Sequence, residues 1–388
     1  MTAVAKAQSD DVAYPSSIGF VLIHAGCFAV FWTGLTWRAG VLAIMLYLVR
    51  LFGIGAGYHR YFAHRAFRTT RLFQFGLALL AQSSAQRGIL WWAANHRLHH
   101  RHSDTTEDVH SPVQRGFLYA HLGWIFVPRN NDTDYSVVRD LSRYNELMWL
   151  DRHPYLPAAV LATMTWLIAG WPGLAIGFCW STVAVWHVTF SINSVAHVVG
   201  RQRYVTGDQS RNNWLLALLT MGEGWHNNHH AYQASVRQGF RWWEYDPTYY
   251  VLRALSWLGI VWDLHVPPRS VISGEHRLGR LVIDKVACQL AASFPINQIA
   301  NQVHDALAHR PGWADVRARI SSARIQAEAF WSDVDLPLVP TLEEVRRYAM
   351  ERIAQTPSLE EIAVRARERL LELVFSRLSE AATASGVT

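Results

Sequence analysis

The feature that most limits how this chain can fold is a histidine spacing, His-x-x-His-His, that occurs twice: HRLHH at residues 96–100 and HNNHH at residues 226–230. Residues three and four apart share one face of a helix, so each motif directs its imidazoles to one side. Neutral imidazole is the commonest side-chain ligand for metals. Each motif therefore predicts a metal-binding face.

Three further histidines extend this pattern, in HRYFAH and NSVAH. The full set is His59, His64, His96, His99, His100, His197, His226, His229 and His230. One metal ion takes four to six ligands, so nine histidines indicate two metals. On a helix, the adjacent His99 and His100 diverge by roughly 100° and can serve different metals. His59 and His64 are five apart, and the glycines at 53, 55 and 57 favour a helix that ends or loosens there.

Polar residues beside these motifs are candidates for supporting roles. Asn193 precedes His197 by four residues and could hold a metal-bound water. Ligating histidines usually donate their other N–H to a carboxylate. The candidate carboxylates are Asp104, Glu107, Asp108 and Glu223. No catalytic residue beyond the metal ligands is predicted.

The remaining histidines are interpreted as structural, because a lone histidine is more often a satisfied core or surface residue than a ligand. They are His24, His102, His153, His187, His265, His276, His304 and His309. His110 and His121 are either structural or partners of the ligands.

Hydropathy predicts an integral membrane protein. The chain is 51% hydrophobic and has 18 Trp, a residue that concentrates at membrane interfaces. Four stretches are long and apolar enough to span a bilayer: Ile18–Trp37, Ala39–Gly57, Tyr155–Trp171 and Gly173–Ile192. Arg50, inside the second stretch, is expected to extend toward the interface. The first two stretches form one hairpin and the last two form another.

This topology puts all nine histidines and both termini on one side. Arginines near the span ends gather on that side, which the positive-inside rule makes cytoplasmic. The net charge of +6 therefore reflects membrane orientation, and nucleic-acid binding is rejected. The three cysteines are scattered, so neither a disulfide framework nor a thiolate metal site is predicted.

Residues 269–388 differ in character from the rest. They contain no long apolar run and no histidine cluster, and they read as amphipathic helices. Thr341-Leu-Glu-Glu344 and Ser358-Leu-Glu-Glu361 each resemble a capping box. The predicted division is a cytoplasmic N-terminal segment (1–17), a membrane domain (18–268) and a soluble helical extension (269–388).

At its histidine motifs the chain resembles the membrane fatty-acyl desaturases, specifically a bacterial type of the stearoyl-CoA (acyl-CoA delta-9) branch. The resemblance runs from about residue 18 to residue 268 and includes HRYFAH, WAANHRLHH, NSVAH and GEGWHNNHH. It implies an all-α fold of four transmembrane helices capped by a cytoplasmic helical domain that holds two iron ions (Fe2+/Fe3+). The C-terminal extension has no counterpart in the animal enzymes.

The resemblance also implies a division of the ligands between the irons. One iron would take His59, His64, His96, His100 and His229, and the other His99, His197, His226 and His230. Asn193 would reach the second iron through water. Gln86, Trp92 and Arg129 would contact the substrate. Where animal acyl-CoA members carry Arg-Asp, this chain has Ala94 and Asn95, which leaves Arg129 as the candidate for the head group.

The implied activity is O2-dependent insertion of a cis double bond, at the delta-9 position, into a saturated fatty acyl-CoA or acyl-lipid in the inner membrane. The chain shows no nucleotide-binding glycine loop or fused cytochrome module, so a separate donor is expected: a ferredoxin or cytochrome b5-like protein with an NAD(P)H reductase. Two alternatives remain. One is a di-iron hydroxylase of a fatty acid or alkane. The other is a metal-binding membrane transporter, whose ligands should lie near mid-bilayer rather than outside the spans.

Overall fold

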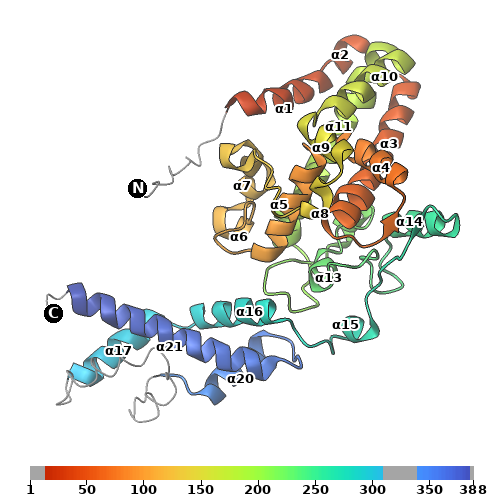
Figure 1. The fold of residues 1–388 in the computed structure, drawn as a ribbon. Coiled ribbons are helices and arrows are strands. Elements are labelled where there is room, and N and C mark those ends of the chain that lie inside the picture. Colours follow the sequence, from red (N-terminus) through yellow and green to blue (C-terminus); the bar gives the residue numbers. More distant parts are fainter. Residues whose placement is uncertain (1–13, 309–338, 385–388) are drawn as a thin grey trace. The chain divides into compact units, whose positions relative to one another are not determined.

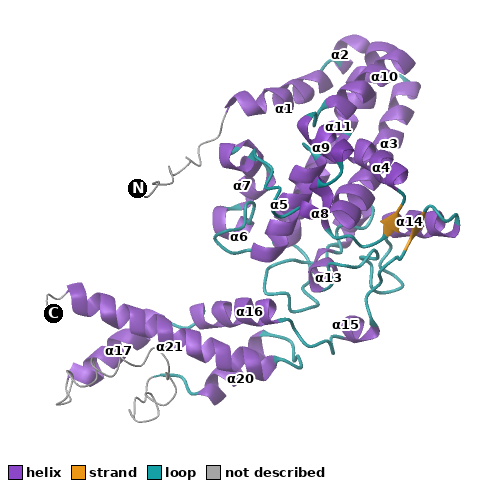
Figure 2. Cartoon of the chain, in the orientation of Figure 1, coloured by secondary structure: helices purple, strands orange, loops and turns teal. Residues whose placement is uncertain are grey.

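The protein is almost entirely helical in a computed structural model that describes residues 14–308 and 339–384 (Figures 1 and 2). Within these ranges the strands are β1 (Arg68–Thr69) and β2 (Val261–Trp262), which pair antiparallel with Arg68 opposite Trp262. The predicted all-α class is confirmed.

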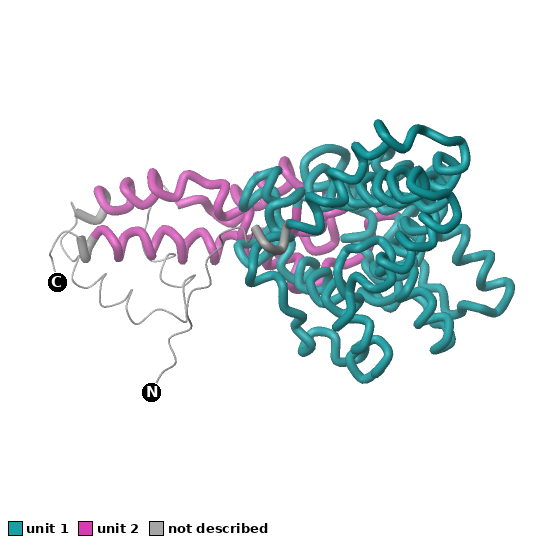
Figure 3. The backbone as a smooth tube through the Cα atoms, turned by 90° about the horizontal axis from the view of Figure 1, so that it is seen from above, with its two compact units in different colours: residues 1–203, 209–272 teal, residues 204–208, 273–388 magenta. Residues whose placement is uncertain are grey.

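Packing divides the chain into two units, coloured separately in Figure 3. Unit 1 comprises Met1–Arg203 and Gln209–Ile272, and unit 2 comprises Tyr204–Asp208 and Ser273–Thr388. The predicted start of the extension at residue 269 lies in α15 (Arg269–Ser273), close to the last division. The short segment Tyr204–Asp208 packs with unit 2, although it precedes that division in the sequence.

The apolar helices of unit 1 form two hairpins, gathered at the top of Figure 1. The first contains α1 (Tyr14–Cys27), α2 (Val30–Thr33), α3 (Trp37–Phe52) and the π-helix η1 (Gly53–Ala63). The second contains α10 (Leu156–Pro172), the π-helix η4 (Gly173–Trp180) and α11 (Ser181–Ser194).

Two continuous segments are long and apolar enough to cross a membrane, Trp37–Ala63 and Leu156–His197, and Ile18–Thr33 is a shorter apolar helix. The second segment is folded back on itself, because Ala169 and Gly170 leave the helical conformation, with Gly170 at φ 63°. A Cβ on Gly173 would lie 2.2 Å from the Thr165 carbonyl oxygen. The turn therefore depends on glycine at both positions.

Arg50 does not extend toward an interface, so that prediction is wrong. Its side chain is buried and donates to Thr182 Oγ1 (2.7 Å), to the Ser181 hydroxyl and to the Leu46 carbonyl (3.2 Å). A buried guanidinium needs hydrogen-bond acceptors, and two hydroxyls of α11 supply them. Arg50 thus ties α3 to α11.

The rest of unit 1 consists of shorter helices around a core that includes Phe62, Leu90, Leu147 and Leu252. These helices are α4 (Arg71–Gln82), α5 (Ile89–His102), α6 (Pro112–Arg115), α7 (Phe117–His121), η2 (Gly123–Phe126), η3 (Pro128–Asn130), α8 (Arg139–Ser142), α9 (Asn145–Arg152), η5 (Val195–His197), α12 (Trp214–Leu219), α13 (His226–Ala231) and α14 (Pro247–Trp257).

Unit 2 is helical over its described residues, with α16 (Arg280–Ala292), α17 (Ile296–Ala308), α20 (Leu342–Arg352) and α21 (Leu359–Ala384). Their apolar faces meet in two clusters on α21, one around Ile362 and Ala366 and one around Leu370 and Val374. Thr341 forms the predicted capping box with Glu344. Ser358 Oγ accepts instead from the Leu278 N–H (3.1 Å).

Candidate metal centre and adjoining cavity

The π-helix η1 explains how His59 and His64 come to share a face. The His64 N–H donates to the His59 carbonyl (3.2 Å), the five-residue step that defines a π-helix. The predicted loosening between these histidines is therefore a widening of the helix. The glycines of η1 allow this helix to pack closely against α4. A Cβ on Gly53 would lie 2.8 Å from Leu80 Cγ, and one on Gly57 would lie 3.2 Å from Leu77.

The start of α5 is fixed by Asp151, whose Oδ1 accepts from the N–H groups of Leu90 (2.9 Å) and Trp91 (3.0 Å). A Cβ on Gly88 would lie 2.1 Å from that oxygen, so the approach requires glycine. The last turns of α5 then present His96 and His100 on one side and His99 on another.

The short helix α13 is held by its two asparagines, a role that sequence reasoning missed. Asn228 is buried and donates to the Gln238 carbonyl and to Glu244 Oε2, both at 2.9 Å, while its Oδ1 accepts from Asn212 (2.7 Å). Asn227 Oδ1 accepts from the Arg203 N–H (2.7 Å). A polar residue between ligand candidates was the available signal for these anchors.

The structure brings all nine histidines into two groups. The first is His59, His64, His96, His100 and His229, and the second is His99, His197, His226 and His230. Within each group the candidate ligand atoms lie within 4.8 Å of one another. This is the division that the family resemblance implied.

In the first group the Nε2 atoms point at one another. His59 and His229 are 2.9 Å apart at Nε2, His229 and His100 2.8 Å, His100 and His96 3.0 Å, and His96 and His64 2.8 Å. Nitrogens that bind one cation at 2.0–2.1 Å and at right angles lie about 2.9 Å apart. The spacing therefore fits a single metal at the centre of the group.

Carboxylates on the far side of three rings fix which nitrogen carries the proton. His59 Nδ1 meets Glu223, His197 Nδ1 lies 3.0 Å from Asp104, and His99 Nδ1 lies 3.1 Å from Asp108. An ionised carboxylate only accepts hydrogen bonds, so Nδ1 donates and Nε2 presents its lone pair. Lone pairs aimed at each other in a buried space repel unless a cation lies between them. The residues present therefore fit metal ions.

Electrostatics keep these groups in the required states. Burial lowers the pKa of His64, His96, His100 and His229 well below its usual value, so these rings are neutral. Burial alone would raise the pKa of Glu223, but Arg60 and His59 hold it at about 2.

Asp104 and Asp108 behave in the same way. Burial opposes their ionisation, yet His197 lowers the pKa of Asp104 and His99 lowers that of Asp108. All three carboxylates are therefore ionised acceptors for ligand candidates.

Glu107, predicted to support a ligand, contacts His102 Nδ1 instead (2.7 Å), and its side chain is 70% exposed. It lies beyond the end of α5, in the turns that follow His102, and belongs to neither group. Sequence reasoning missed Arg60, which is buried and donates to Glu223 Oε1 (2.9 Å), to Asp246 Oδ1 (2.9 Å) and to the Val236 carbonyl (2.7 Å). Its position beside His59 was the only available signal.

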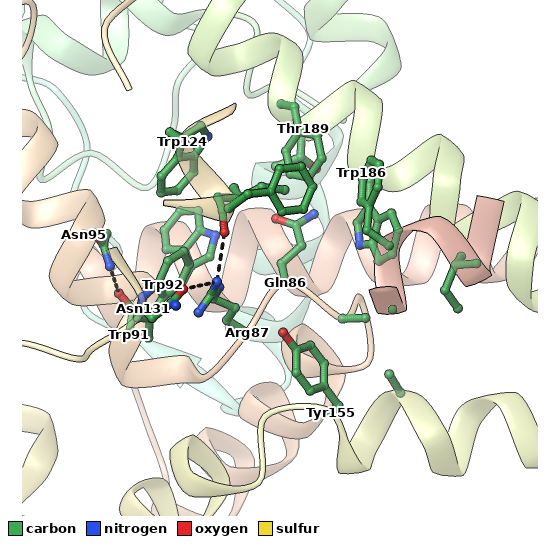
Figure 4. Close-up of a pocket in the computed structure, with 18 of the residues that line it drawn as sticks. Gln86, Arg87, Trp91, Trp92, Asn95, Trp124, Asn131, Tyr155, Trp186 and Thr189 are labelled. Carbon is green, nitrogen blue, oxygen red and sulfur yellow. Dashed lines mark hydrogen bonds between the residues drawn. The ribbon is translucent and has the colours of Figure 1, made fainter. Parts of the chain in front are cut away.

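A cavity of about 840 Å3 adjoins the first group (Figure 4). His96 and Trp92 line it, and Trp92 stacks on the His96 ring with centroids 4.8 Å apart. The walls are mainly aromatic and aliphatic, from α1, η2, α10 and α11. Gln86 and Asn193 also line the cavity.

Arg129 lies in η3 and does not line the cavity, so its predicted role has no support in this geometry. The cation at the wall is Arg87, which donates to the Ile125 carbonyl (2.9 Å) and to Asn131 Oδ1 (2.6 Å) and lies over the Trp91 ring. Figure 4 shows it between Trp91 and Gln86.

The histidines interpreted as structural lie outside both groups, and His309 falls outside the described residues. His153 Nδ1 donates to the Trp149 carbonyl (2.8 Å). His110 is buried against His99 and Trp124 and lines the cavity, and burial lowers its pKa to about 3. His24, His187 and His121 form a hydrogen-bonded chain that ends on Ser194.

The sequence profile of the family described as fatty acid desaturase matches residues 35–260, which contain all nine histidines. The chain belongs to the fatty acid desaturase family. This desaturase is therefore an oxidoreductase. The matched region ends at residue 260, before the C-terminal extension begins.

Relatives of this desaturase act at different positions. An acyl-CoA 5-desaturase of Anemone leveillei is 37% identical over 253 residues, which cover 63% of this chain and 77% of the relative. The sn-2 palmitoyl-lipid 9-desaturase of a Nostoc species is 32% identical over 69% of this chain and 96% of its own. The sn-1 stearoyl-lipid 9-desaturase of a Synechocystis species is 35% identical over 62% and 76%.

Proposed function

We propose that this desaturase inserts a cis double bond into a saturated long-chain fatty acyl group, with O2 as oxidant and a histidine-bound pair of irons. The observation that carries the proposal is the convergence of nine histidines in two groups beside an apolar cavity. Imidazole also suits zinc and copper, and membership of the family favours iron. When bound, the irons supply the oxidising power needed to remove hydrogen from an unactivated methylene.

The ligand assignment follows the two groups. His59, His64, His96, His100 and His229 hold one iron, and His99, His197, His226 and His230 hold the other. Glu223, Asp104 and Asp108 orient three of these rings through Nδ1. Asn193, at the cavity wall, supports a water on the second iron, and no histidine outside the nine is a ligand.

The cavity residues position the substrate. Trp92 is stacked between Tyr58 and His96, so its ring is fixed at the place where an acyl chain passes the first group. Gln86 is buried at the same wall, and its Nε2 has no hydrogen-bond partner among the residues that the structure describes. It is therefore a donor for the acyl carbonyl oxygen. The aromatic walls exclude water from the chain between these points.

The reaction must balance with an outside donor. Two adjacent methylenes each lose one hydrogen atom, and O2 is reduced to two waters. The acyl chain supplies two electrons and two protons, so two more of each must arrive per turnover. A ferredoxin or a cytochrome b5-like protein with an NAD(P)H reductase fits this requirement.

We further propose that the two apolar hairpins are four transmembrane helices in the inner membrane, with both termini and all nine histidines on the cytoplasmic side. Residues 18–268 form the catalytic domain, and residues 269–388 form a helical extension without metal ligands. The double bond is placed at delta-9 because the histidine motifs resemble the delta-9 branch. Other relatives are named as 5- and 7-desaturases, so the position of the double bond is the most specific part of the proposal.

The test is to express the full chain in a host that lacks unsaturated fatty acids and to identify the product lipids by mass spectrometry with double-bond localisation. The expected product is a delta-9 monounsaturated C16–C18 chain. An alkene at another position would correct the regiochemistry alone. A hydroxylated chain, or no product from iron-loaded protein supplied with electrons, would contradict the proposal.

A further inference from the structure

We propose that the cavity opens sideways between α1 and α10 into the hydrocarbon of the bilayer, and that the substrate enters there as an acyl chain of a membrane glycerolipid. This rests on the proposed function and names its substrate class. The structure offers three separate observations for it: which residues line this side of the cavity, how exposed they are, and how α1 is held.

Two helices that are distant in sequence form this side of the cavity. From α1 come Gly19, Phe20, Leu22 and Ile23, and from α10 and the residue before it come Tyr155, Ala158, Ala159 and Ala162. Alanines on α10 and a glycine on α1 leave space where larger side chains would fill the gap between the helices. The space is therefore continuous from one helix to the other.

Residues of this wall are exposed as well as lining the cavity, which marks an opening. Leu22 is 64% exposed and Tyr155 is 54% exposed, and Gly19 and Ala159 are also exposed. A closed wall would bury these residues. The opening therefore runs along the helices and is not confined to the end of the cavity near the histidines.

The medium outside this opening is hydrocarbon. The outer faces of both helices carry exposed apolar side chains: Ile18, Val21, Val160 and Met164. Contiguous exposed apolar surface of this kind belongs against lipid. An acyl chain can pass from the bilayer into the cavity without crossing water, so its transfer has no desolvation cost.

The hydrogen bonds that α1 makes to other helices lie on the side away from the opening. His24 Nδ1 donates to the Phe20 carbonyl (2.8 Å), so its Nε2 accepts from His187 Nε2 (3.0 Å), whose Nδ1 in turn accepts from His121 (3.1 Å). Trp180 Nε1 donates to the Cys27 carbonyl (2.9 Å). These contacts hold α1 from the side of η4 and α11.

Phe20 stacks on Trp186 with centroids 5.1 Å apart, again on the α11 side. In the described part of the chain no hydrogen bond joins α1 to α10. The histidine chain thus holds α1 at the edge of the opening without closing it.

Photo-crosslinking of the full-length protein tests the route. The protein is placed in phosphatidylcholine vesicles that contain a phosphatidylcholine with a diazirine in its saturated chain, and adducts are mapped by peptide mass spectrometry. The expected adducts are at residues that line the opening, Gly19, Leu22, Ala158 and Ala159, and exceed those at the outer-face residues Val21 and Val160. Adducts spread over the outer apolar faces, with none at these residues, overturn the route.

A second arm separates this failure from that of the proposed function. A diazirine-bearing stearoyl-CoA is offered to the same vesicles. Suppose that the stearoyl-CoA labels the cavity and is desaturated, whereas the phospholipid neither labels the cavity nor is desaturated. The lateral route is then wrong and the desaturase assignment stands. If neither substrate is desaturated by iron-loaded protein supplied with electrons, the proposed function fails as well.

A matched pair of variants completes the test. Ala159→Trp places an indole inside the opening, and Val160→Trp places the same side chain at the neighbouring residue, which does not line the cavity. Overfilling should lower the turnover of phospholipid chains about tenfold for the first variant. Equal turnover for the two variants overturns the proposal. Iron content and the wild-type adduct map identify a variant that merely misfolds.

Discussion

The two histidine groups differ in the charge that surrounds them. Behind the five-histidine group, Glu223 and Asp246 share the buried guanidinium of Arg60. Behind the four-histidine group, Asp104 and Asp108 contact histidines, a serine hydroxyl and backbone N–H groups. Within the described residues, no arginine or lysine contacts either carboxylate.

This difference teaches that similar ligand spacings can create unlike sites. A carboxylate that accepts from a ligand ring makes that ring a stronger donor. Arg60 draws off part of the negative charge behind the first group, whereas the second group keeps the charge of two carboxylates. The account therefore predicts two inequivalent irons, with the four-histidine site favouring the more positive ion.

The largest expected effect comes from removing a ligand. His99→Ala should cost more than about 100-fold in desaturation, because loss of even an outer partner of a ligand costs about 10–100-fold. Iron content, measured by atomic emission, should fall from two toward one per chain. His102→Ala, three residues further along α5, should keep both irons. Full activity of the first variant would break the division into groups.

The next effect concerns stability. Arg60→Met should destabilise the protein by about 3 kcal/mol, because it leaves two buried carboxylates without their cation. Arg68→Met removes the same charge from an exposed pair with Asp263 (3.3 Å) and should cost less than about 1 kcal/mol. Denaturant unfolding in detergent measures both. Similar losses would show that Arg60 has no special role behind the first group.

Carboxylate variants sharpen the comparison further. Asp104→Asn and Glu223→Gln should each lower iron affinity about 10–100-fold. The larger loss is expected for Asp104→Asn, since no guanidinium competes for that carboxylate. Competition with a graded series of chelators gives the two affinities. An equal loss, or a larger one for Glu223→Gln, would contradict the charge argument.

The smallest effect is expected at Glu107. Glu107→Gln removes an exposed contact to His102, and surface changes of this kind stay within about 0.5 kcal/mol. Activity within about twofold of wild type, in the assay used for Asp104→Asn, would agree with its place outside the groups. A tenfold loss would mean that Glu107 supports a ligand after all.

Spacing on helix faces predicted that nine histidines serve two metals, because ligands of one metal must point the same way. The division of these histidines into groups of five and four came from the family resemblance. Sequence reasoning could not foresee the π-helix at residues 53–63, which depends on close packing of glycines against Leu77 and Leu80. It also missed Arg60, Asn228 and Arg87, whose partners come from distant segments. Glu107 and Arg129 were chosen for their place in the sequence. In the fold Glu107 contacts His102, and Arg129 does not line the cavity.

The central claim is that the chain holds two unlike irons in these two groups. Mössbauer spectroscopy of the full-length protein, purified from cells grown on 57Fe, tests it most directly. The account predicts two irons per chain and two quadrupole doublets of equal area, with Asp104→Asn shifting one doublet and Glu223→Gln the other. A single iron per chain, or one doublet altered alike by both variants, would contradict the account.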